Sequence, residues 1–329
     1  MHGCNKTVFS RWLRKHYWLF LISFLSLISV SWAAEDLPSV KMPLVSKSLL
    51  LDISQAGPNR LVAVGERGHI LLSDDHGLSF RQVIAPTQST LTTLFFLDDK
   101  NGWAGGHDTV LLVTKDGGET WEKKFYDPDR GKPVLDICFM DASFGIAIGA
   151  YGLYLETRDG GATWEDKYFE SLDDPDMGLV HFNAMTRSAE GVLFIAGEAG
   201  FLARSIDSGA TWESLEKIYP GSYFSALFTQ QGTLIVAGLR GNAFRSTDKG
   251  DTWEPIITQT LQGLNHCVQD KEGRILISGL GSTLLISNDD GKSFVPVKRS
   301  DRISIAAAAL PDKETIVIVG DGGVMRITN

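Results

Sequence analysis

Cysteine is scarce in this sequence, with three in 329 residues. Cys4 precedes an apolar N-terminal run, and Cys138 and Cys267 each lie in an apolar, strand-like segment of a different repeat. An exported protein could pair Cys138 with Cys267, and this is the alternative, but the repeats described below place them far apart. We predict that Cys138 and Cys267 are small buried side chains that form no disulfide bond.

Long apolar runs are lacking beyond the N-terminus, where residues 17–32 follow four basic residues and precede Ala33. This order predicts a secretory signal peptide over residues 1–33, cut after Ala33, and a single exported domain over 34–329. The alternative is an uncleaved anchor. The run is short of the about 20 residues that span a bilayer, which favours cleavage.

An excess of positive charge is also absent. The chain has 31 basic and 40 acidic residues, a formal charge of −9, and loss of the four basic residues of the leader makes it −13. Nucleic-acid surfaces need a basic footprint, and so does docking on anionic lipid headgroups. Both functions are therefore excluded.

Glycine, by contrast, is abundant, and much of it lies in a phrase such as TKDGGETW (114–121) that occurs six times. The third residue is always aspartate, at intervals of 41 to 48 residues. Repeats of this length with short strands are typical of β-propellers. The six aspartates are Asp75, Asp116, Asp159, Asp207, Asp248 and Asp289.

A seventh repeat, GDGGVMRIT (320–328), lacks the phrase but keeps the glycine that lies eight residues before it elsewhere. Each repeat reads as four strands, A to D; in the second they are 91–97, 102–106, 109–114 and a strand from Trp121. We therefore predict an all-β, seven-bladed propeller of four-stranded blades. The last blade lacks a D strand, and we expect the N-terminal segment 39–45 to supply it and close the ring. Closure would leave no open edge, so we expect a monomer.

The repeated aspartates are interpreted as structural. Each can accept backbone N–H bonds a residue or two further on, while the glycine at the fifth position takes a positive φ and the closing Trp or Phe is buried. A catalytic or calcium-binding role is the alternative. Six equal copies do not suit an active site, and the phrase lacks the alternating oxygen ligands of a calcium loop. We predict no metal and no cofactor.

The phrase is similar to the Asp box, or BNR repeat, which sialidases and several propeller families carry. GWAGGHDTVLLVTKDGGETW (102–121) and GIAIGAYGLYLETRDGGATW (145–164) resemble the photosystem II stability and assembly factor family. The resemblance implies an export signal and a seven-bladed propeller. It also implies a non-enzymatic factor in the periplasm or thylakoid lumen that helps assemble or stabilise an integral membrane complex.

The B–C turns, between the glycines that recur in every repeat, are the candidate binding face. A–B and C–D turns should lie on one face of the ring, and B–C turns and D–A connections on the other. The glycines are fixed while the residues between them vary, as expected of a scaffold that presents a site on loops. Ordinary solvated turns are the alternative. The candidate residues are Glu66, Arg67, His107, Asp108, Tyr151, Glu198, Arg240 and Asp321.

Three functions fit a propeller of this kind. A sialidase-like glycosidase would need an arginine cluster and a nucleophile with a base, for which only Arg67, Arg240 and the pair Tyr151 and Glu198 are available. A carbohydrate-binding propeller would need exposed aromatic platforms, of which Tyr151 is one. A scaffold that binds an integral membrane protein needs only a rigid ring and a varied face, and we favour it.

Overall fold

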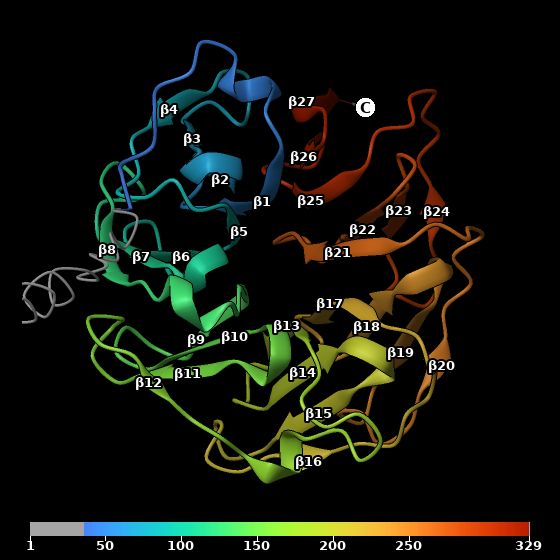
Figure 1. Ribbon diagram of the computed structural model, residues 1–329. Coiled ribbons are helices and arrows are strands. Elements are labelled where there is room, and N and C mark those ends of the chain that lie inside the picture. The colour runs from blue at the N-terminus through green and yellow to red at the C-terminus, as the bar shows by residue number, and fades with distance from the viewer. Residues whose placement is uncertain (1–35, 329) are drawn as a thin grey trace, which may run out of the picture. The chain divides into compact units, whose positions relative to one another are not determined.

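The computed structural model describes residues 36–328, and the predicted signal peptide lies outside them. Asp36 and the residues after it form one compact unit. Seven antiparallel sheets surround a central channel (Figure 1), which confirms the all-β, seven-bladed propeller. In the described part of the chain, no helix is long and apolar enough to cross a membrane.

Strands run outward from the channel in chain order within each blade. Blades one to three contain β1 (Leu50–Gln55), β2 (Leu61–Gly65), β3 (Ile70–Ser73), β4 (Arg81–Val83), β5 (Leu91–Phe96), β6 (Gly102–Gly106), β7 (Leu111–Thr114), β8 (Glu122–Phe125), β9 (Val134–Phe139), β10 (Gly145–Gly149), β11 (Tyr154–Thr157) and β12 (Glu165–Asp166). Blades four to seven contain β13 (Phe182–Arg187), β14 (Leu193–Gly197), β15 (Leu202–Ser205), β16 (Glu213–Ser214), β17 (Tyr223–Phe228), β18 (Leu234–Gly238), β19 (Ala243–Ser246), β20 (Glu254–Pro255), β21 (Leu264–Gln269), β22 (Ile275–Gly279), β23 (Leu284–Ser287), β24 (Val295–Pro296), β25 (Ile305–Ala309), β26 (Thr315–Gly320) and β27 (Gly323–Thr328).

The B strands form the buried middle of every blade, with all residues of β2, β6 and β10 buried. Their continuous apolar sequence reflects burial on both faces of the sheet. Large rings fill the space between blades: Trp103 stacks on Phe139 of the next blade with ring centroids 3.5 Å apart. Cys138 and Cys267 are buried and free, as predicted. The core is thus a set of packed interfaces between successive sheets.

All six Asp boxes share one hydrogen-bond pattern. In the second, one Asp116 oxygen accepts the Thr120 N–H at 2.9 Å and the other accepts the Thr120 hydroxyl at 2.6 Å. The Thr114 hydroxyl donates to Asp116 and accepts the Gly118 N–H at 2.9 Å. The backbone N–H that Asp116 accepts is four residues further along the chain, rather than one or two residues as expected. The fifth-position glycine takes a positive φ, +90° in Gly118, as predicted. Every carboxylate is therefore engaged inside its own turn.

Asp116→Ala is expected to lower the free energy of unfolding by about 1–2 kcal/mol, the usual scale for lost hydrogen bonds to a charged group near the surface. Asp116→Asn keeps one acceptor oxygen and should lose about half as much. Urea unfolding of both variants measures this, with Lys115→Ala, an exposed change in the same turn, as the control. Equal stability of Asp116→Ala and Lys115→Ala would contradict the structural role.

The prediction that residues 39–45 form the outer strand of the seventh blade is wrong. The seventh sheet has three strands, β25, β26 and β27, and residues 39–45 pair with none of them. The Ser39 N–H instead donates to the Ala85 carbonyl at 2.9 Å, and the Gln82 side chain bonds the backbone of Val40 and Met42. These polar contacts hold the segment along the outer side of the first blade, which periodicity alone could not foresee.

The ring closes by packing between the first and last blades. Ile53 and Leu71 share a buried cluster with Val317 and Val319. The Arg326 guanidinium also donates to the His76 carbonyl at 3.3 Å. Because the outer edge of β27 carries no strand among the described residues, closure gives no argument for a monomer.

Candidate functional site

The B–C turns repeat one backbone contact in all seven blades. The first N–H of each turn donates to the carbonyl of the residue before strand A of the same blade, at 2.9–3.3 Å. This contact places the turns and the D–A connections on one face, as the sequence predicted. The donor–acceptor pairs are Glu66–Leu49, His107–Thr90, Ala150–Pro133, Glu198–His181, Leu239–Ser222, Leu280–Gly263 and Asp321–Ser304.

The second residue of the turn is held in the left-handed region. Its φ is +54° in Arg67, +58° in Asp108, +54° in Tyr151 and +57° in Arg240. Such a conformation is unusual for residues other than glycine and costs energy that the surrounding contacts must offset. The turns therefore present these side chains from a fixed backbone.

Three of the predicted acidic side chains accept a hydrogen bond from the backbone next to their own turn. Glu66 accepts the Leu49 N–H at 3.2 Å, Glu198 the His181 N–H at 3.2 Å and Asp321 the Ser304 N–H at 3.1 Å. Each carboxylate thus fixes the entry to strand A. Repeated Glu or Asp directly after the first glycine was the sequence signal for this role, and the sequence analysis missed it.

The Asp108 carboxylate is also partnered, because it accepts the Ser89 hydroxyl at 2.6 Å. Four predicted side chains remain exposed and make no side-chain hydrogen bond or ion pair among residues 36–328. They are Arg67, His107, Tyr151 and Arg240.

Tyr151 is 53% exposed and lies edge-on against His181, with ring centroids 4.6 Å apart. His181 also provides the N–H that Glu198 binds. The structure therefore brings Tyr151 and Glu198 into contact with the same residue, with the Glu198 carboxylate occupied by the backbone. The other predicted residues are distributed around the ring rather than clustered.

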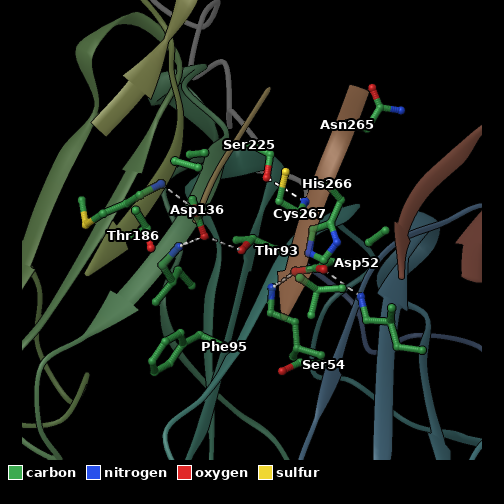
Figure 2. Close-up of a pocket in the computed structure, with 18 of the residues that line it drawn as sticks. Asp52, Ser54, Thr93, Phe95, Asp136, Thr186, Ser225, Asn265, His266 and Cys267 are labelled. Carbon is green, nitrogen blue, oxygen red and sulfur yellow. Dashed lines mark hydrogen bonds between the residues drawn. The ribbon is translucent and has the colours of Figure 1, made fainter. Parts of the chain in front are cut away.

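A cavity of about 520 Å³ occupies the channel, lined by the A strands of all seven blades. Figure 2 shows Asp52, Asp136 and His266 on its wall. The third residue of strand A accepts an N–H from the next blade: Asp52 from Leu94 at 2.7 Å and Asp136 from Met185 at 2.7 Å. Ser225 and His266 accept in the same way from the following blades.

The second residue of strand A instead donates a hydrogen bond to the next blade. Thr92, Asn183 and Asn265 give their hydroxyl or amide hydrogens to a carbonyl of the next blade, at 2.5–2.9 Å. Polar groups that face the channel thus tie neighbouring blades together. The repeated LDI of 51–53 and 135–137 was a signal for this ladder that the sequence analysis did not use.

Enclosure in the channel shifts the titration of its ionisable groups. It raises the pKa of Asp52 to about 7 and that of Asp136 to about 6, against the opposing effect of their backbone N–H donors. It lowers the pKa of His266 to about 4. Within residues 36–328, no group of three or more His, Cys, Asp or Glu side chains is placed to hold a metal ion.

Solved propellers resemble this fold throughout. The structure titled "YCF48 bound to D1 peptide" has a TM-score of 0.68 and 18% identity, covering 91% of this chain and all of that one. YCF48 from Cyanidioschyzon merolae has a TM-score of 0.67 and 17% identity, covering 88% of this chain and 97% of that one. The WD40 propeller of Doa1 scores 0.66 at 15% identity over 89% of this chain and 96% of that one. At such identities the likeness establishes the fold alone.

The sequence comparisons match a smaller part of the chain than the structural ones, but they identify a family. The photosystem II stability/assembly factor HCF136 of Cyanidioschyzon merolae is 35% identical over 65 residues. That match spans 19% of this chain and 15% of the relative. The family model described as photosynthesis system II assembly factor YCF48 matches residues 127–329, more than half of the sequence. The chain therefore belongs to the YCF48 family of photosynthesis system II assembly factors.

Proposed function

We propose that this protein is an exported, non-enzymatic scaffold that helps assemble or stabilise an integral membrane protein complex. It does so by binding an extramembrane segment of one membrane protein on the B–C face. Membership of an assembly-factor family supports this role. A propeller of the same fold has been solved with a D1 peptide, so this architecture can hold a peptide.

The observation that carries the proposal is the set of exposed side chains on rigid turns. Arg67 and Arg240 offer guanidinium groups with no ion-pair partner in the described chain, and Tyr151 offers an exposed ring. Arginine and tyrosine are the residue types that dominate protein interfaces. Because their backbones are already fixed, binding a partner costs little ordering of the turns.

Crosslinking in intact cells that produce the full chain tests the proposal. Affinity capture after crosslinking should recover one integral membrane protein in excess over the same cells without crosslinker. Turnover of a fluorogenic sialoside, or selective binding on a glycan array with no membrane protein recovered, would favour the glycosidase or lectin alternative and contradict the scaffold.

A further inference from the structure

Among residues 36–328, the seventh blade has no outer strand. Its sheet contains β25, β26 and β27, whereas each of the other six sheets in the described chain has four strands. In the sixth blade, Leu285 and Ile286 of the C strand pair with Pro296 and Val295. The residues at the same repeat positions of β27 are Arg326 and Ile327. On the side of β27 that faces away from β26, the backbone N–H and C=O groups are therefore available to pair with another extended chain.

Two segments border this edge. The turn Val45–Lys47 contacts β27, and Val45 shares a buried cluster with Val324. On the other side, Ile303 packs in a cluster with Ile327, and the Arg299 guanidinium contacts the Met325 sulfur at 3.2 Å. Packed segments therefore flank β27 next to its open edge.

The two bordering segments carry exposed basic side chains, although the whole chain has a formal charge of −9. The exposed Lys47, Lys298 and Arg302 have no ion-pair partner in the described part of the chain. Asp301 is the only acidic residue within 295–304, and it pairs with Arg299. Two copies joined edge to edge would bring these cations together, so charge disfavours a second copy and favours an acidic occupant.

The other blades show which sequence suits this position. Outer strands begin with glutamate in four blades, at Glu122, Glu165, Glu213 and Glu254. Glu213 and Glu254 pair with arginines of the adjacent C strand, at 3.0 and 2.7 Å. In these four blades, the position next to strand C is therefore filled by a short extended segment that starts with an acidic side chain.

We propose that β27 binds a short, acidic, extended segment of a partner protein, which adds to the seventh blade as its fourth strand between Val45–Lys47 and 297–303. Strand addition supplies affinity through backbone hydrogen bonds, and the basic border supplies selectivity. The site uses none of the four exposed side chains of the proposed function, Arg67, His107, Tyr151 and Arg240, and goes beyond that function, so either can fail alone.

A capped peptide that copies residues 251–260 (DTWEPIITQT), an outer strand of this chain, is the probe for the full-length protein. Hydrogen exchange should slow at amides 324–328 when the peptide is added. The exposed-residue variant Lys47→Glu/Lys298→Glu/Arg302→Glu should weaken binding about tenfold, because the loss of two surface pairs to the peptide's two carboxylates and the repulsion by the introduced glutamates are worth roughly 1.4 kcal/mol together. Arg67→Ala/Arg240→Ala should leave peptide binding unchanged.

Binding that is absent, insensitive to charge reversal or without protection at 324–328 would overturn the proposal. So would protection at 324–328 that rises with protein concentration in the absence of peptide, because a second copy would then occupy the edge. Circular dichroism of the charge-reversed variant confirms that it is folded before the comparison is made.

Discussion

Replacing Arg67, His107, Tyr151 and Arg240 together by alanine will reduce affinity for the captured membrane protein by about 100-fold or more. Arginine and tyrosine at an interface each contribute about 2 kcal/mol or more when they are central, and 1.4 kcal/mol corresponds to a factor of ten. Alanine is suited to these turns, because Ala199 already occupies the same left-handed position in the fourth blade, with a φ of +51°.

Binding of the purified variant to the captured partner measures this effect. Lys115→Ala/Lys292→Ala removes two exposed cations from C–D turns on the opposite face and is the matched control. The control should bind as the wild type does. If the fourfold variant also keeps wild-type affinity and unfolds at the same urea concentration, the B–C face is not the binding surface.

The channel carboxyls are expected to make the protein less stable as pH rises from about 4 to 7. Asp52 and Asp136 have raised pKa values of about 7 and 6, so the native state holds protons that the unfolded chain has released. The unfolding free energy then falls with pH across this window. One pKa unit is about 1.4 kcal/mol. Partial solvent exposure of both carboxyls reduces the effect, and we expect a loss of about 2–4 kcal/mol for the pair.

Asp52→Ser/Asp136→Ser isolates this contribution, because serine already serves as the acceptor at this position in Ser225. His266 acts in the opposite sense, since its lowered pKa makes stability rise as pH increases from about 4. The test is therefore the difference between wild type and double variant in urea unfolding at several pH values. Ser225→Ala should lower stability without changing the slope. Parallel pH profiles for wild type and double variant would contradict the prediction.

The sequence was sufficient to predict the number of blades and the position of the turns, because both depend on local chemistry that recurs. In the second blade the B strand is Gly102–Gly106 as predicted, and the A strand, expected over 91–97, is Leu91–Phe96. The C strand starts at Leu111 rather than residue 109, since His107–Thr109 form a 3-10 turn. Glycine spacing and burial of the box ring constrain these elements within a single repeat.

Contacts between segments that lie far apart in the sequence were harder to predict. Residues 39–45 were predicted to be the missing outer strand because no other segment was spare, yet side-chain bonds from Gln82 and an Asp36–Lys123 ion pair of 2.7 Å hold this region against the first two blades. The roles of Glu66 and Glu198 as backbone acceptors were also missed, although an acidic residue after the first glycine recurs in three blades. A sequence pattern shows which face of a strand is apolar and does not show which backbone group a polar side chain will reach.

The most direct test of the scaffold account is the face from which the partner crosslinks. A photoreactive residue at Leu239 lies on a B–C turn, and one at Ile206 lies in the C–D turn after β15; these side chains are 38% and 76% exposed. We predict that the Leu239 probe captures the membrane protein in cells and the Ile206 probe does not. Equal capture by both probes, or capture by Ile206 alone, would contradict binding on the B–C face.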